Sequence, residues 1–121
     1  MPVLGVVRAG VPTLAVEDIE GYLDLDSMVY PEDNLFALRV KGDSMIDEGI
    51  LPDDFVVVRR QSMAEVGEII VALIGEEATV KVLTKKGDQY YLEPANVNYD
   101  PIPFTRDTFI AGKVINVVRK Y

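Results

Sequence analysis

The sequence predicts a mainly β domain, and three observations support this fold class. Runs rich in β-branched and aromatic residues recur along the chain at the spacing of short strands. Residues that favour tight turns separate these runs. No window shows a strong 3.6-residue apolar repeat of the kind that marks an amphipathic helix. The 121 residues suit one domain, and we expect a compact barrel-like domain of several antiparallel sheets.

Six runs have the composition of strands. In chain order they are residues 35–40, 55–59, 68–74, 78–83, 89–93 and 108–119. Turn-forming residues lie between several of them, and we expect one hairpin turn between Leu73 and Val80 and a second at Gly87-Asp88. Residues 16–20 and 62–66 are candidates for one helical turn each.

Charge and composition exclude several classes of function. The chain has 12 Lys and Arg against 20 Asp and Glu, a net charge of −8, so nucleic-acid binding by this chain alone is not expected. It has no cysteine, which excludes disulfides, thiolate zinc sites and cysteine nucleophiles. It has no histidine, which excludes Ser-His, Cys-His and His-metal mechanisms. Any catalytic base must therefore be a carboxylate, a lysine or a tyrosine.

The first residues do not have the pattern of a targeting segment. The apolar start is only a few residues long and already contains Arg8, so it is too short for a membrane span and lacks the order of a signal peptide. With no cysteine and no export signal, a cytoplasmic protein is expected.

Ser44 is the candidate nucleophile among the three serines. It follows Gly42-Asp43 directly after the predicted strand 35–40 and precedes Met45. A glycine at this point permits the sharp turn that exposes a hydroxyl and aims successive N–H groups at one place. Taken alone, the pattern is more typical of a serine in an ordinary turn.

Lys81 lies in the middle of the predicted strand 78–83, with apolar neighbours on both sides. Alternation along a strand places Thr79, Lys81 and Leu83 on one face. Such a lysine can guard a solvent-exposed sheet edge against aggregation. Alternatively, burial can lower its pKa until the neutral amine accepts a proton from a serine hydroxyl. In a chain without histidine this is the natural route to a serine nucleophile.

A third feature is the small pair Ala9-Gly10, which follows the apolar residues Val6 and Val7. Small side chains let a backbone enter a tight groove, and glycine permits a bent conformation. An ordinary turn after a first strand explains the same pattern.

Together these features resemble the self-cleaving C-terminal domain of the family of LexA repressors, UmuD and phage repressors, which is distantly related to signal peptidases. The resemblance rests on residues 2–12, 38–45 and 78–83, on the 37-residue separation of Ser44 and Lys81, and on supporting stretches such as 92–96. It covers nearly the whole chain and implies a LexA/signal-peptidase type of fold.

The resemblance implies a Ser-Lys peptidase that cleaves its own Ala9–Gly10 bond. Lys81 is then the general base, Ser44 is the nucleophile, and the backbone N–H groups of Asp43 and Ser44 are the oxyanion donors. Residues 1–14 would form the cleavage-site segment and residues 15–121 the catalytic and dimerisation domain. No cofactor and no metal are expected.

The resemblance also implies partners. A homodimer is expected, with the long apolar strand 108–119 as a candidate contact or as an internal strand of the sheet. The family's activator is the filament of RecA on single-stranded DNA, and cleavage ends repression of DNA-damage-response genes. Operator DNA would be bound only through an N-terminal helix-turn-helix domain. No such domain is present in these 121 residues, so the chain is expected to be the C-terminal part of the repressor.

Three alternatives stay open at this stage. A UmuD-like mutagenesis protein and a non-catalytic regulatory dimerisation domain fit the same motifs, and the absence of an anchor disfavours a signal peptidase. Carboxylate catalysis is the weakest alternative, because the paired acids all lie in or near turns, where solvated loops are expected. These pairs are Asp53-Asp54, Glu76-Glu77 and Asp43/Asp47.

Overall fold

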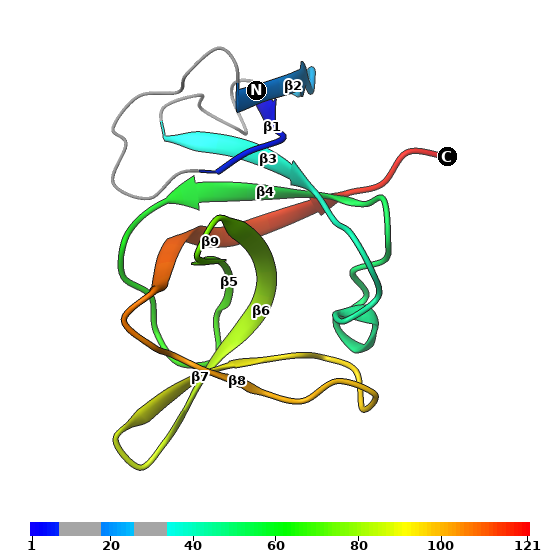
Figure 1. The fold of residues 1–121 in the computed structure, drawn as a ribbon. Helices are drawn as coiled ribbons and strands as arrows, with labels where there is room; N and C mark the ends of the chain where they lie inside the picture. The colour runs from blue at the N-terminus through cyan, green and yellow to red at the C-terminus, as the bar shows by residue number, and fades with distance from the viewer. Residues whose placement is uncertain (8–17, 26–33) are drawn as a thin grey trace.

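The fold was analysed in a computed structural model, which describes residues 1–7, 18–25 and 34–121. Within these residues nine strands form one continuous sheet (Figure 1). The strands are β1 (Pro2–Leu4), β2 (Ile19–Tyr22), β3 (Leu35–Arg39), β4 (Phe55–Arg60), β5 (Ile69–Ile74), β6 (Glu77–Lys86), β7 (Gln89–Glu93), β8 (Ile102–Pro103) and β9 (Thr108–Val118). A 3-10 helix, η2 (Ile46–Glu48), follows β3.

The mainly β prediction is confirmed, and all six expected strands are present within a few residues of their predicted ends. The two hairpin turns also lie where they were expected, between β5 and β6 and between β6 and β7. Three short strands (β1, β2 and β8) were not among the six, because two to four residues carry too little of the period-2 pattern to be recognised.

One of the two expected helical turns was predicted wrongly, because residues 62–66 contain no helix. Of the other candidate, residues 16–17 lie outside the described residues, Asp18 is in a 3-10 conformation, and Ile19 and Glu20 belong to β2. A segment as short as 62–66 has little helical stability of its own.

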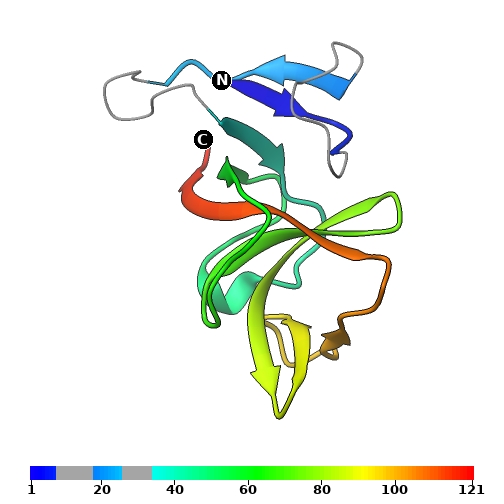
Figure 2. The ribbon, with the colours of Figure 1, turned by 90° about the vertical axis from the view of Figure 1, so that its left-hand side faces the viewer.

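The order of the strands in the sheet is β2-β1-β3-β4-β9-β5-β6-β7-β8. It is a mixed sheet rather than several antiparallel ones, because β1 runs parallel to β3. Figure 2 shows the sheet strongly curled, with β1 and β2 at one end of the molecule and β7 and β8 at the other. The curling lets one sheet enclose its own core.

Strand β9 joins the two halves of the sheet. Its first part pairs with β5 and its second part with β4, and the two pairings overlap at Gly112 and Lys113. A Cβ atom on Gly112 would collide with the carbonyl oxygen of Arg59 and with the side chain of Val58. Glycine is therefore required where β9 passes from one partner to the other. In the strand order β9 lies between β4 and β5, but only Gly112 and Lys113 are paired on both sides.

Apolar side chains from both halves meet in the main core. Leu4 and Val7 from the first strand region lie there against Phe36, Val56 and Leu73. The short strand β1 is thus anchored by burial as well as by pairing, since Val3 and Leu4 are nearly inaccessible to solvent.

An ion pair between the exposed Arg119 and the buried Asp54 fixes the end of the chain to the region of η2. The Arg119 guanidinium donates to Asp54 Oδ1 at 2.7 Å and Oδ2 at 2.8 Å, and to the carbonyl oxygen of Gly49 at 3.0 Å. The N–H of Leu51 also donates to the Asp54 carboxylate. Asp54 was expected in a solvated acidic turn, but it is buried. The hydrogen bond from Arg119 holds the pKa of Asp54 below its ordinary value, although burial opposes this shift.

This ion pair predicts an acid-sensitive part of the stability. Because the pKa of Asp54 is lower in the folded than in the unfolded chain, its contribution is complete above the ordinary carboxyl pKa of about 3.9 and is lost as the pH falls through the depressed value. Asp54→Asn should lower the free energy of unfolding at pH 7, and the difference from wild type should shrink below about pH 4. Chemical denaturation at several pH values measures this. Asp53→Asn, at the exposed neighbour, is the control and should show no such pH dependence.

Candidate active site

Ser44 lies in the irregular turn between β3 and η2. The chain leaves β3 at Arg39, and Gly42 adopts a left-handed conformation with φ of 75° that side chains other than glycine rarely tolerate. Met45 follows directly and is buried in the main core. The turn is therefore anchored immediately after the serine, while the serine itself stays partly accessible.

Lys81 lies in the middle of β6, opposite Ile70 of β5. It is only 7% exposed. Strand β6 is internal to the sheet, between β5 and β7. The interpretation of Lys81 as a solvent-facing guard of a sheet edge is therefore wrong.

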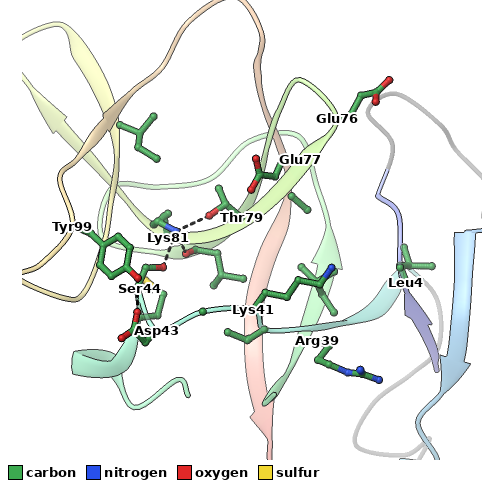
Figure 3. A pocket seen from close by; sticks show the side chains of 18 of the residues that line it. Leu4, Arg39, Lys41, Asp43, Ser44, Glu76, Glu77, Thr79, Lys81 and Tyr99 are labelled. Carbon is green, nitrogen blue, oxygen red and sulfur yellow. Dashed lines mark hydrogen bonds between the residues drawn. The ribbon is translucent and has the colours of Figure 1, made fainter. Parts of the chain in front are cut away.

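The structure brings the two side chains together. The Lys81 Nζ atom donates to Ser44 Oγ at 2.9 Å, to Thr79 Oγ1 at 2.6 Å and to the carbonyl oxygen of Val80 at 3.1 Å. Figure 3 shows Lys81 between the side chains of Ser44 and Thr79. The three acceptors fix the amine in space next to the serine hydroxyl.

The electrostatic environment favours the neutral amine. Burial lowers the pKa of Lys81 below its ordinary value, and the carboxylate of Glu77 partly opposes this shift. A neutral amine has a free lone pair and can accept a proton from the hydroxyl beside it. The pair Ser44–Lys81 can thus generate an alkoxide-like nucleophile without an imidazole.

A groove of about 490 Å³ runs past the pair. Lys81, Thr79 and Glu77 of β6 lie on one side of it, and Arg39 and Lys41 lie at the end of β3 and just beyond it. Leu4 and Gly5, at the end of β1 and just after it, line the same groove. The groove therefore lies beside both the Ser44–Lys81 pair and the end of β1.

The backbone of the nucleophile turn is held from one side. The carbonyl oxygen of Asp43 accepts a hydrogen bond from Asn96 Nδ2 at 2.9 Å, and that of Ser44 accepts one from the N–H of Ala95 at 2.8 Å. The N–H groups of Asp43 and Ser44 belong to the same turn as Ser44 Oγ. Their role as oxyanion donors stays a prediction. Ala9 and Gly10 lie outside the described residues.

Three residues of the site were not assigned a role from sequence. Thr79 was recognised only as sharing a face with Lys81, and strand alternation was the signal that could have identified it as a partner. Asn96 and Tyr99 reach the turn from more than fifty residues along the chain. Asn96 ends one of the stretches that support the family resemblance, but no local pattern assigns a role to it or to Tyr99. Their contacts depend on how β7 and the turn after it pack against the turn of Ser44.

With this geometry established, the comparison with known proteins is informative. A family model described as Peptidase S24-like matches residues 2–115. This chain belongs to the peptidase S24-like family. The match covers Ser44, Lys81 and all strands from β1 to β8.

The S24-like chain is also similar to named relatives. It is 48% identical over 123 residues to the LexA repressor of Carboxydothermus hydrogenoformans, 49% over 120 residues to that of Alkaliphilus oremlandii, and 48% over 123 residues to that of Geobacillus kaustophilus. These alignments include 99–100% of this chain and 58–60% of each relative. The chain therefore spans about 60% of the length of the curated relatives it matches.

Two further observations concern the part of the chain that the structure describes. No helix within it is long and apolar enough to cross a membrane. Nor do its acidic residues gather in a cluster able to hold a metal ion.

The buried amine of the S24-like site predicts a stability effect with a defined sign. Because the pKa of Lys81 is lower in the folded than in the unfolded chain, keeping it charged destabilises the fold at neutral pH, and this penalty is relieved as the pH rises through the folded pKa. Lys81→Met should therefore raise the melting temperature at pH 7. The increase in melting temperature should become smaller as the pH approaches the ordinary lysine pKa of about 10.4.

Calorimetry from pH 6 to pH 10 measures this effect, with Ser44→Ala in all chains so that no chemistry at the serine intervenes. Lys86→Met, at an exposed lysine of the same strand, is the matched control. A Lys81→Met chain that melts below its parent at pH 7 would contradict the inferred environment.

Proposed function

We propose that this chain is the C-terminal domain of a LexA-like repressor of the SOS response, and that it cleaves its own Ala9–Gly10 bond with Ser44 as nucleophile and Lys81 as general base. The observation that supports this most strongly is the 2.9 Å contact between a buried lysine and a serine in a chain with no histidine and no cysteine. Membership in the peptidase S24-like family supports the same chemistry.

In the proposed mechanism the neutral Lys81 amine takes the proton of Ser44 Oγ, and Oγ attacks the carbonyl carbon of Ala9. The N–H groups of Asp43 and Ser44 stabilise the oxyanion that forms. When the C–N bond breaks, the Lys81 ammonium returns its proton to the departing Gly10 nitrogen. Lys81 then deprotonates a water molecule that attacks the ester, and it returns this proton to Ser44 Oγ as the C–O bond breaks. The new acid at Ala9 loses its proton to solvent and leaves as a carboxylate.

Tethering of the substrate makes this chemistry favourable. Gly5 lines the groove that contains Ser44 and Lys81. Ala9 is four residues further along, a span of at most about 14 Å of extended chain. The scissile bond can therefore enter the groove without a second molecule, and orientation of this kind is worth roughly 7–11 kcal/mol of barrier in favourable cases.

Regulation of the cut would use two positions of the cleavage segment. Val3, Leu4 and Val7 are buried in the core, so movement of residues 1–14 must be confined to the part after Val7. A partner that binds the position with the scissile bond in the groove would raise its population. We assign this role to the filament of RecA on single-stranded DNA, so that DNA damage triggers cleavage and ends repression.

Dimerisation is part of the proposal, and β9 supplies the surface. Up to Lys113 the strand pairs with β5, but from Val114 to Val118 only β4 pairs with it among the described residues. Within this stretch the N–H of Val117 donates to Oδ1 of its neighbour Asn116, which is exposed. This exposed edge can pair with the same edge of a second copy around a twofold axis, and operator DNA would be bound by a separate N-terminal domain.

The proposal predicts slow self-cleavage at alkaline pH. Incubation near pH 10 should convert the chain into fragments 1–9 and 10–121, since a rising pH supplies the neutral form of Lys81. Mass spectrometry identifies the fragments. The rate should follow a single deprotonation, and Ser44→Ala and Lys81→Ala should each abolish the cut while the fold is retained.

A serine-directed acylating probe at pH 9–10 distinguishes this function from a non-catalytic dimerisation domain. Modification of Ser44 that is lost in Lys81→Ala supports the peptidase. An intact chain after long incubation, together with an unreactive Ser44, would rule the peptidase out.

Sedimentation over a range of concentrations tests the dimer. A particle of twice the chain mass is expected. Asn116→Lys places a charge at the exposed residue of this edge and should shift the equilibrium toward the monomer, because like charges would meet across the twofold axis. A wild-type chain that stays monomeric at all concentrations would contradict the assignment.

A further inference from the structure

The segment that follows β7 contacts the nucleophile turn through Ala95, Asn96 and Tyr99. Ala95 exchanges backbone hydrogen bonds with both sides of the turn: its N–H donates to the Ser44 carbonyl, and its carbonyl accepts from the N–H of Asp47, each at 2.8 Å. Asn96 and Tyr99 add side-chain bonds to Asp43. Four hydrogen bonds thus connect two segments about fifty residues apart in the sequence.

Asn96 uses both ends of its amide. Its Nδ2 donates to the carbonyl oxygen of Asp43 at 2.9 Å, and its Oδ1 accepts from the N–H of Asn98 at 3.0 Å. The residue is only 6% exposed. A carboxylate of the same shape could accept from Asn98 but could not donate to Asp43. The amide is therefore matched chemically to this position.

Tyr99 contacts the same residue from the groove side. Its hydroxyl donates to Asp43 Oδ1 at 2.5 Å, and Figure 3 shows the ring beside Ser44. The hydrogen bond to the Asp43 carboxylate raises the pKa of Tyr99 above its ordinary value. The same bond therefore favours the protonated hydroxyl that donates to Asp43.

We propose that Asn96 and Tyr99 are positioning residues that hold Asp43 from two sides and thereby fix Ser44 Oγ and the adjacent N–H groups for attack. This inference rests on the proposed function. The turn has no regular secondary structure on the side of β3, where Gly42 adopts a left-handed conformation. The bonds to Asp43 supply the rigidity that the turn itself lacks on this side, while Met45 anchors the other.

Asn96→Asp is the direct test, because it keeps the shape and the bond from Asn98 and removes only the donor to Asp43. A displacement of the order of 1 Å can cost about a hundredfold in rate, so we expect cleavage to slow by about tenfold to a hundredfold. The reduction in cleavage rate should persist when the rate is extrapolated to a pH at which Lys81 is fully neutral. Val97→Asp, at a neighbouring position that is 95% exposed, introduces the same charge without touching Asp43 and is the matched control.

Tyr99→Phe provides a second variant at a partly exposed position, where the fold is not at risk. It should slow cleavage by a smaller factor and leave the pH midpoint of the lysine unchanged. Tyr90→Phe makes the same chemical change on β7, where the ring lies against Phe104 instead of in the groove, and should cleave at the wild-type rate.

Amide hydrogen exchange separates this inference from the peptidase proposal, since it needs no cleavage. In a Ser44→Ala background, Asn96→Asp and Tyr99→Phe should accelerate exchange at residues 42–45, whereas Val97→Asp and Tyr90→Phe should not. If both test variants exchange like their controls, the positioning role is wrong even if the chain cleaves itself. If exchange rises as expected but the wild-type chain never cleaves itself, Asn96 and Tyr99 do hold the turn and the peptidase proposal fails.

Discussion

The chemistry of the candidate site depends on one partly buried contact, that between the Lys81 amine and the Ser44 hydroxyl. An ammonium group is costly to bury, and the fold offsets this cost only with neutral acceptors: two hydroxyls and a backbone carbonyl. A carboxylate in direct contact with Lys81 would stabilise its ammonium form, so the amine would no longer be available as a base. Among the residues that the structure describes, the carboxylate of Glu77 acts on Lys81, and it only partly opposes the effect of burial.

The two partners of this contact are held by different means. Lys81 comes from a long strand within the sheet, where pairing with β5 fixes its backbone. Ser44 comes from a turn whose position depends on Met45 in the core and on the segment 95–99. A rigid base and a separately anchored nucleophile converge on one groove, which also reaches the end of β1.

Sequence reasoning was most successful where chemistry or periodicity is local. The lack of histidine directed attention to a lysine, alternation placed Thr79 beside it, and long β-branched runs gave the main strands. It failed where the decisive contact is distant. Asp54 was expected in solvent but pairs with Arg119, and nothing near Asn96 or Tyr99 indicates that they contact Asp43. Strands of two to four residues were missed because they form only when a neighbour supplies the pairing.

The placement of β1 affects what happens once a chain is cut after Ala9. Strand β1 is hydrogen-bonded between β2 and β3, and Val7 is still seated in the core. Breaking the covalent link would thus leave a nicked but assembled molecule, in which the short N-terminal product stays docked like an inserted peptide. Departure of this product would expose apolar surface to water. Dissociation of the product, rather than hydrolysis, would then limit the rate at which the two fragments separate.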